Sequence, residues 1–244
     1  ESERSFTTAL VHDPRLGAAH FERGILRLRR YEDLRDILEL RAVSGSVRVA
    51  PRSEDPPEAA RWKLGAKEDF DAMTSLEVPE SDQLFARGFA LVLDERYEDA
   101  EPVFNVSLQK YELNADAWEY RAFCRMARGD MAGAFEDLTR ELRIRPRWPR
   151  GHYYRATASL FLGNPESALA DYREAIRLDP ARPGIYVQRS IAYRHLRLFE
   201  KAMEDIDHAL RLDVRSCEAW MARGHVHYEM RKMREAGADY TRAI

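Results

Sequence analysis

Apolar and small residues occur along this chain at the spacing of amphipathic helices, and the helical runs come in pairs. In residues 149–180, a first run carries Tyr153 and Leu160 on one face, and a Gly-Asn-Pro sequence at residues 163–165 ends it. A second run starts at Ala168 and ends before an Asp-Pro sequence. Glycine and proline break helices, so this pattern predicts two helices of about 14 residues joined by a tight turn. Such a pair of helices cannot bury its apolar faces alone.

The same pair of helices recurs with a period of 34 residues. An alanine of the second helix keeps this step at Ala100, Ala134, Ala168, Ala202 and Ala236. An arginine of the first helix keeps it at Arg87, Arg121, Arg155, Arg189 and Arg223. A small residue follows each arginine, namely Gly88, Ala122, Ala156, Ser190 and Gly224. A fixed period of this size predicts a repeat array, in which each unit buries its apolar faces on its neighbours.

These positions resemble the tetratricopeptide repeat (TPR), with about seven full or partial repeats in the chain. Residues 81–244 hold five in-phase copies, the last one truncated. Further matching positions are Trp118, Trp220, Gly129, Gly163, Phe104, Tyr172, Tyr240, Ala175, Ala209, Ala243, Pro146 and Pro180. The resemblance implies an all-α fold, a right-handed superhelical solenoid of antiparallel helix pairs, with a concave groove lined by the first helices. The chain departs from the family pattern in its arginine ladder, in Glu141 at a small-residue position, and in Pro102 inside a second helix.

Upstream of residue 81 the array continues in an altered form. Residues 1–14 match the second helix of a truncated repeat, and residues 15–80 match one repeat with an insertion at about residues 31–60. The matching residues are Phe21, Arg23 and Gly24 in the first helix, and Ala66, Asp69, Phe70 and Met73 in the second. Both ends of the chain cut a repeat, so we expect it to be a fragment or to have its ends covered by something else.

The insertion is expected to lengthen both helices into a projecting helical hairpin. We predict helices at residues 17–43 and 57–77, with a loop between them and a candidate short extended piece at residues 47–49. An independent disordered insertion is the alternative.

Most arginines of the ladder have an aspartate partner in the second helix of their repeat. Asp137, Asp171, Asp205 and Asp239 each follow an arginine by 16 residues. Arg23 and Asp69 keep this relation once 30 inserted residues are removed. Antiparallel helices bring such positions level, so we expect a bidentate, partly buried pair in each of these repeats. We interpret the pairs as setting the register of the helices, with an anion-binding ladder as the alternative. Arg87 faces Val103 and lacks the acid.

The candidate site is the set of first-helix residues that face the groove in the family. They are Phe85, Phe89, Glu119, Tyr120, Phe123, Arg150, Tyr153, Tyr154, Gln188 and Arg194. Aromatic residues at helical spacing are more often core, and this alternative stays open for each one. The first helices also use small residues for packing, so we expect a surplus of exposed aromatic rings and a groove that binds an apolar or amphipathic peptide or helix.

Composition and charge narrow the function classes. The net charge of −3 with 33% charged residues predicts a surface of mixed sign, without a general attraction to nucleic acid or anionic membrane. Cys124 and Cys217 are too few and too far apart for a disulfide framework or a zinc site, and we expect both to be buried in a reducing, cytoplasmic compartment. No run approaches the ~20 apolar residues of a membrane span.

Candidate catalytic chemistry is sparse. The chain holds no Gly-rich phosphate loop or nucleophile elbow, and His225 and His227 diverge on a helix, so we expect no catalytic residues, no cofactor and no metal. Four arginines around Trp148 predict a solvated turn, with phosphate or single-stranded nucleic acid binding as the alternative.

The function predicted from the sequence is that of a non-enzymatic scaffold or adaptor region, with a protein or peptide partner and a place within a larger assembly. One alternative is a co-chaperone module, which is disfavoured because only Arg150 is basic at the positions that form a clamp in such relatives. The other alternative is a non-catalytic arm of a larger enzyme.

Overall fold

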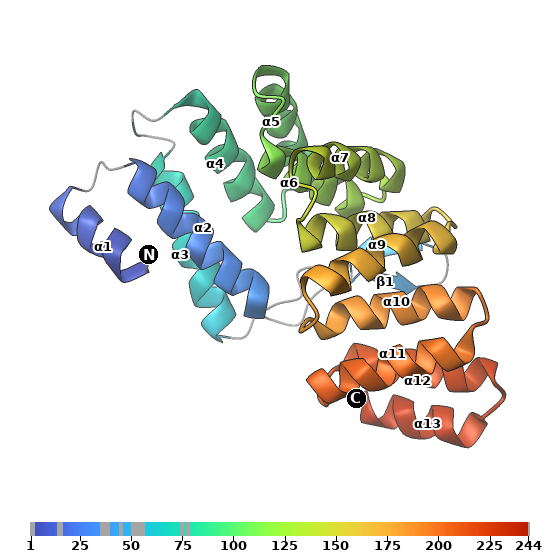
Figure 1. Ribbon diagram of the computed structural model, residues 1–244. Helices are drawn as coiled ribbons and strands as arrows, with labels where there is room; N and C mark the ends of the chain where they lie inside the picture. The colour runs from blue at the N-terminus through green and yellow to red at the C-terminus, as the bar shows by residue number, and fades with distance from the viewer. Residues whose placement is uncertain are drawn as a thin grey trace. The chain divides into compact units, whose positions relative to one another are not determined.

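The computed structural model describes residues 3–13, 17–34, 40–43, 46–49, 57–73, 76 and 79–243. These residues form helices that follow one another in antiparallel pairs, together with one two-stranded β-hairpin (Figure 1). The chain divides into two compact units, which we call the first unit (Glu1–Asp130) and the second unit (Met131–Ile244). The all-α fold class predicted from the sequence is confirmed.

The first unit contains the altered repeats. Its elements are α1 (Glu3–His12), α2 (Gly17–Leu34), β1 (Leu40–Val43), β2 (Ser46–Val49), α3 (Pro57–Met73), α4 (Glu80–Leu93), α5 (Tyr97–Lys110) and α6 (Ala115–Ala127). Helix α2 packs against α3, and α4 packs against both α3 and α5.

The second unit contains regular repeats. Its elements are α7 (Met131–Ile144), α8 (Pro149–Phe161), α9 (Pro165–Leu178), α10 (Pro183–His195), α11 (Phe199–Leu212), α12 (Cys217–Glu229) and α13 (Met233–Arg242). Each helix packs against the next, and α10 also packs against α12, so first helices of successive repeats are neighbours.

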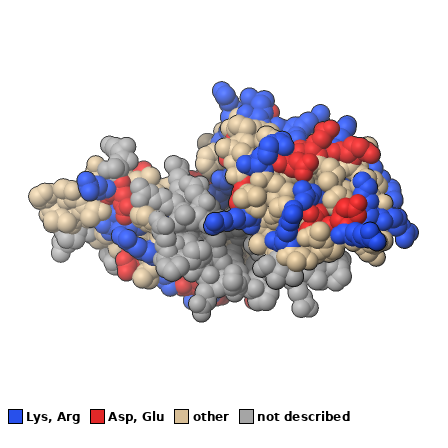
Figure 2. Space-filling model, turned by 90° about the horizontal axis from the view of Figure 1, so that it is seen from below, with Lys and Arg blue, Asp and Glu red and all other residues tan. Residues whose placement is uncertain are grey.

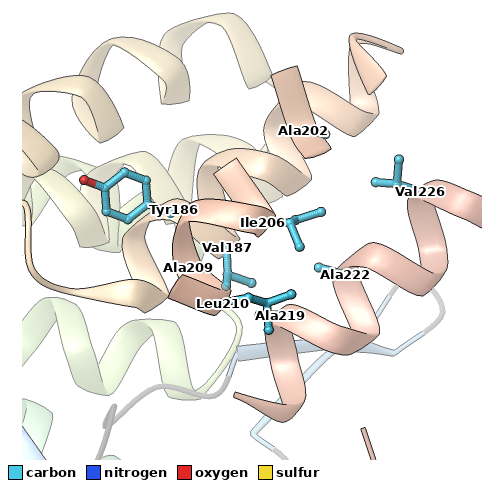
Figure 3. Packing of buried hydrophobic residues seen from close by; sticks show 9 residues of the cluster. All are labelled: Tyr186, Val187, Ala202, Ile206, Ala209, Leu210, Ala219, Ala222 and Val226. Carbon is cyan, nitrogen blue, oxygen red and sulfur yellow. The ribbon is translucent and has the colours of Figure 1, made fainter. Parts of the chain in front are cut away.

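The core of the second unit is built from small residues and a few large ones. Figure 3 shows the buried cluster that contains Val187 of α10, Ile206 of α11 and Val226 of α12, together with two alanines of α11 and two of α12. Ile206 is fully buried, which contributes roughly 2 kcal/mol to folding. The small residue after each arginine leaves room for the second helix, because a Cβ at Gly224 would lie 2.5 Å from the ring of Tyr240.

The tight turn between the two helices of a repeat is the same in five copies, although its sequence differs. Its central residues all have positive φ, at Glu95, Gly129, Gly163, Arg197 and Arg231. After each one, an amide donates to a carbonyl five residues earlier, as from Asn164 to Ser159 at 3.0 Å. This left-handed helix cap favours glycine, yet three copies use a charged residue instead.

The insertion differs from the prediction in its fold. Helix α2 ends at Leu34, whereas the sequence predicted a helix to residue 43, and Leu40–Val43 forms a strand paired with Ser46–Val49. Residues of alternating character around the Ser-Gly sequence at residues 44–45 favour a hairpin over a helix. Helix α3 ends at Met73, before the predicted residue 77. Both helices are nevertheless longer than the 13–14 residues of α4 to α12.

Candidate functional site

The arginine–aspartate pairs are the most regular polar feature of the described residues. Arg155 donates to both carboxylate oxygens of Asp171 at 2.7 Å. Arg189 does the same to Asp205, at 2.8 and 2.6 Å. The carboxylates are buried and the arginine side chains are partly buried. The predicted pairs are therefore confirmed in these repeats, while Arg121 and Asp137 belong to different units and their pair stays a prediction.

Arg223 joins three helices. Its guanidinium donates to Asp239 of α13 at 2.8 Å and to Asp207 of α11 at 3.4 Å. The guanidinium also lies over the ring of Trp220, 4.3 Å from the ring centroid, in a cation–π contact. An aromatic ring three residues before the arginine recurs in Trp118 with Arg121 and in Tyr186 with Arg189. Sequence reasoning missed this role of the ring, although its constant spacing from the arginine was visible.

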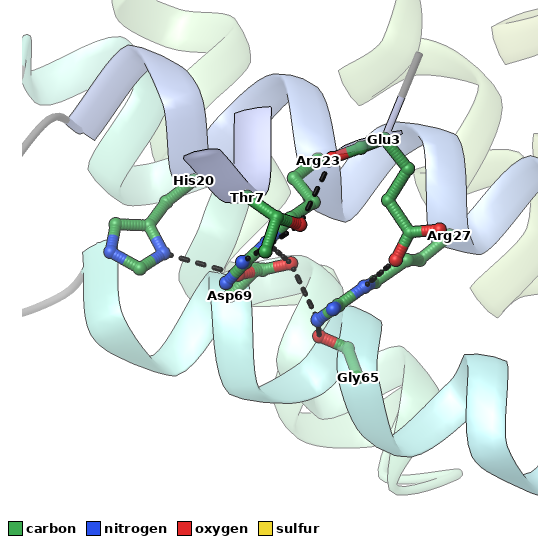
Figure 4. A network of polar contacts seen from close by, with 7 residues as sticks. All are labelled: Glu3, Thr7, His20, Arg23, Arg27, Gly65 and Asp69. Carbon is green, nitrogen blue, oxygen red and sulfur yellow. Dashed lines mark hydrogen bonds and ion pairs between the residues drawn. The ribbon is translucent and has the colours of Figure 1, made fainter. Parts of the chain in front are cut away.

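The equivalent pair in the first unit carries more partners. Figure 4 shows Asp69 of α3 with His20, Arg23 and Arg27 of α2 around its carboxylate. Arg27 also donates to Glu3 of α1 at 2.9 Å. The network ties α1, α2 and α3 together, and it confirms that Arg23 lies beside Asp69 despite the insertion.

Position 152 replaces the aromatic ring by a histidine that bonds the aspartate directly. His152 Nδ1 lies 3.1 Å from Asp171 Oδ1, and this hydrogen bond raises the pKa of His152. Burial acts to raise the pKa of Asp171, but hydrogen bonds from Arg155 and His152 outweigh it and lower that pKa. Both shifts favour a charged network in the folded state.

Arg87 is the exception in the ladder. It is exposed, and no hydrogen bond or ion pair joins it to another described residue. Its repeat has Val103 in place of the aspartate and Leu84 in place of the ring. The helix pair α4–α5 therefore packs without an arginine–aspartate pair. The rings of Phe85 and Phe104 meet between the two helices instead, with their centroids 6.5 Å apart.

Six of the predicted groove residues are buried. They are Phe85, Phe89, Glu119, Tyr120 and Phe123 in the first unit and Tyr154 in the second. The ring centroid of Phe89 lies 4.4 Å from that of Tyr120, edge to face. The ring centroid of Phe123 lies 5.7 Å from that of Tyr97. The surplus of exposed aromatic rings expected from the sequence is not found at these positions, because the rings fill the space between neighbouring helices.

The remaining predicted residues are partly exposed and all lie in the second unit: Arg150, Tyr153, Gln188 and Arg194. Arg194 of α10 forms an ion pair with Glu229 of α12. Beyond the predicted set, Met221 is 36% exposed and Tyr228 is 58% exposed on α12. We call Tyr153, Ile191, Arg194, Met221 and Tyr228 the first-helix surface of the second unit.

Two histidines border this surface, and both stay neutral at neutral pH. Desolvation lowers the pKa of His195 and of His225, and the positive charge of Arg194 acts in the same direction. Glu229 opposes the shift. Because Glu229 also neutralises Arg194, the first-helix surface of the second unit carries little net charge.

Charge is mixed elsewhere too. Figure 2 shows basic and acidic side chains intermixed over the described part of one face. Among the described residues, no cluster of three or more His, Cys, Asp and Glu could hold a metal ion. None of the helices within the described ranges is long and apolar enough to cross a membrane.

The cysteines differ from each other. Cys124 is buried as expected, and desolvation, followed by the charge of Glu101, raises its pKa to about 12. Cys217 is exposed, which corrects the expectation that both are buried. It is the first residue of α12 and follows the cap residue Ser216, so its side chain lies outside the helix packing.

The comparisons with known proteins agree with this geometry. Two tetratricopeptide repeat models match the chain, one at residues 85–149 and one at residues 149–182. Residues 85–182 of this chain are therefore similar in sequence to the tetratricopeptide repeat family. The comparison with curated proteins gave no match.

Solved structures share the tetratricopeptide repeat fold. TTC0263, a thermophilic TPR protein of Thermus thermophilus, is 24% identical with a TM-score of 0.57, over 67% of this chain and 89% of that one. MamA of Desulfovibrio magneticus RS-1 is 16% identical with a TM-score of 0.63, over 68% and 94%. YrrB, described as a TPR protein with an unusual peptide-binding site, is 16% identical with a TM-score of 0.55, over 89% and 97%. Tetratricopeptide repeat arrays present extended surfaces to other proteins, so the fold indicates a protein-interaction scaffold.

Proposed function

We propose that this chain is a non-enzymatic scaffold or adaptor region that binds an apolar or amphipathic segment of a protein partner. The observation that carries the proposal is the first-helix surface of the second unit. There, Met221 and Tyr228 are exposed while the neighbouring first-helix residues Val187 and Val226 are buried. Large apolar side chains that stay exposed beside a well-packed core are typical of an interaction site.

The composition of the surface defines the partner chemistry. Tyrosine and methionine give large contact areas, and Tyr153 and Ile191 are available for further burial on neighbouring first helices. Arg194 and Glu229 are already paired with each other, so they orient a ligand more than they attract it. The partner is therefore a segment with an apolar stripe, and its affinity should depend only weakly on salt. The peptide-binding site ascribed to YrrB supports a peptide ligand.

In this role the chain has no catalytic function, works within a larger cytoplasmic assembly and has no nucleic acid partner. A lysine-and-arginine clamp of the co-chaperone kind is not expected, because Arg150 is the lone basic residue at the family's clamp positions. Its guanidinium lies over the ring of Tyr154, 5.6 Å from the ring centroid.

The test is selection of random peptides on the intact chain, followed by affinity measurement with the selected peptides. We expect the selected peptides to carry an apolar stripe. The double variant Met221→Ala with Tyr228→Ala should weaken the binding of these peptides at least tenfold, which corresponds to about 1.4 kcal/mol. Met233→Ala is the matched control, because Met233 is 49% exposed but lies on the second helix α13. Selected peptides that tolerate the double change, or that lose affinity steeply with salt, would rule out this surface.

A further inference from the structure

The left-handed position of the tight turn directs its side chain away from the helix pair. A Cβ added at Gly163 of the α8–α9 turn would meet no atom within 4 Å. Arg197 of the α10–α11 turn and Arg231 of the α12–α13 turn occupy the same position, with φ of 58° and 64°, and both are exposed. Glycine has the lower energy at such φ values, so the stability of the turn does not explain the two arginines.

The charge at this position has an ionic partner in one repeat but not in these two. In the first unit, Glu95 of the α4–α5 turn lies 3.8 Å from Lys63. The guanidinium of Arg197 lies over the ring of Phe199, 5.3 Å from its centroid, and its side chain has no ion pair with any other described residue. Within the described part of the chain, the side chain of Arg231 has no ion pair or hydrogen bond either.

Apolar side chains flank both arginines. The sequence is Leu-Arg-Leu-Phe at residues 196–199 and Met-Arg-Lys-Met at residues 230–233. Leu198 is 39% exposed and Met233 is 49% exposed. Residues 196–201 and 230–235, which we call the turn surface, carry five Lys and Arg residues and two Glu residues, in a chain whose net charge is −3. The turn surface is therefore locally basic, with apolar side chains between its charges.

The two turns lie at the same edge of the second unit. Successive helices are antiparallel, so α10 and α12 run in the same direction, and they pack against each other. Each turn follows the C-terminal end of one of these helices. Packed helices have axes about 8 to 10 Å apart. An extended segment rises about 3.3 Å per residue, so acidic side chains about three residues apart on such a segment would reach both turns.

We infer that the turn surface binds an acidic segment of a protein partner, in which Asp or Glu residues about three positions apart are interspersed with apolar residues. The cations attract the acidic side chains, and Leu198 and Met233 bury the apolar ones. Because each of these two side chains is more than half covered, neither extends far enough to enter a lipid bilayer. The site lies beyond the ion pair of Arg194 and Glu229, so it is separate from the first-helix surface and goes beyond the proposed function.

The probe is a fluorescent peptide of repeated Asp-Glu-Leu triplets, and its binding to the intact chain is measured by anisotropy. Arg197→Gly with Arg231→Gly should weaken binding at least about tenfold, while the glycines favour the turn and keep the chain folded. Arg143→Gln with Arg215→Gln is the matched control, because it removes the same charge from other exposed positions of the second unit. A peptide of Asn-Gln-Leu triplets should not bind. Equal losses in the two double variants, or no binding to the parent, would overturn the inference.

The apolar contacts are tested with the same peptide. Leu198→Ala with Met233→Ala should weaken its binding about threefold, because part of the buried apolar area is lost. Met221→Ala with Tyr228→Ala should leave its affinity unchanged, since both residues lie on the first-helix surface. Failure of the proposed function at that surface is therefore distinguishable from failure here. Acidic peptide binding that depends on Met221 and Tyr228 would overturn the separate site.

A membrane surface is the competing occupant. Vesicles of phosphatidylserine and phosphatidylcholine should not bind the chain. Vesicle binding that is lost in the glycine double variant, without binding of the acidic peptide, would overturn the inference in favour of anionic lipid.

Discussion

The interrupted repeat α2–α3 and the regular repeat α8–α9 form the same arginine–aspartate pair, although the connections between their helices differ in length. In the first, Arg23 meets Asp69 across 46 residues of chain, and in the second, Arg155 meets Asp171 across 16. The connections between the helices differ, but both helix pairs are antiparallel and place the charges at the same level. Side-chain packing between the helices therefore sets their register, and the connection only has to permit it.

The carboxylates of Asp69 and Asp171 differ in the number of side chains that bond them besides the arginine. Asp69 bonds His20 and Arg27 in addition to its arginine, whereas Asp171 bonds His152 alone besides its arginine. Removing the arginine should therefore leave a less compensated charge in the regular repeat. We expect substitutions at these pairs to change the free energy of unfolding most. Changes at the connections between helices should have smaller effects, and a substitution of His152 should have the smallest.

Arg155→Leu should lower the free energy of unfolding by about 2 to 3 kcal/mol, because it strands the carboxylate of Asp171 in a mostly buried site. Arg23→Leu should cost less, since two cationic or hydrogen-bonding groups remain around Asp69. Urea unfolding followed by circular dichroism measures both. Adding Asp171→Leu to Arg155→Leu should recover much of the loss, and Arg147→Leu, at an exposed arginine, is the control. Single variants that unfold like the parent would show that the pairs do not set the register.

Deleting residues 32–61 should convert the interrupted repeat into an ordinary one. The deletion restores the 16-residue separation of Arg23 and Asp69 that the regular repeats have. We expect a chain that still folds cooperatively and loses about 1 to 2 kcal/mol, since the new turn lacks a residue suited to the left-handed cap. Helical content and thermal unfolding measure this. An unfolded product would mean that the insertion is required for the pairing of α2 with α3.

The left-handed turn position offers a smaller, matched pair of changes. Gly163→Ala should destabilise the chain by about 1 kcal/mol through backbone strain alone, because a Cβ there meets no atom within 4 Å. Arg197→Gly, at the same position one repeat later, should instead stabilise the chain, raising the free energy of unfolding by about 0.5 kcal/mol. Thermal unfolding of the two variants compares them directly. Equal signs would contradict a shared turn conformation.

The histidine at position 152 should make stability depend on pH. Its pKa is raised in the folded state, so its contribution is fully present below the unfolded pKa of about 6.5 and is lost as pH rises through the folded pKa. The stability difference between the parent and His152→Gln should therefore shrink, by less than about 1 kcal/mol, between pH 6 and pH 8. His225→Gln should show the opposite trend, because the folded pKa of His225 is lowered. Parallel pH curves for the parent and both variants would contradict this assignment.

The candidate site was only partly visible in the sequence. Groove positions follow from the repeat register, so Tyr153, Arg194 and their neighbours could be assigned to first helices in advance. The exposure of each aromatic side chain could not be predicted from the sequence, because it depends on which neighbouring residue fills the space beside the ring. Phe89 is buried since Tyr120 lies edge to face against it, while Tyr228 finds no such cover and is 58% exposed.

By itself, the sequence determined the repeat period, the all-α fold, and the arginine–aspartate pairs within repeats. These follow from local periodicity and from side chains that meet whenever two helices of known register pack together. Tertiary structure alone decided that Glu95, Arg197 and Arg231 adopt the left-handed conformation that favours glycine. At these positions local propensity was outweighed by a requirement of the packing, because the helix pairs need the same left-handed turn to bring their faces together.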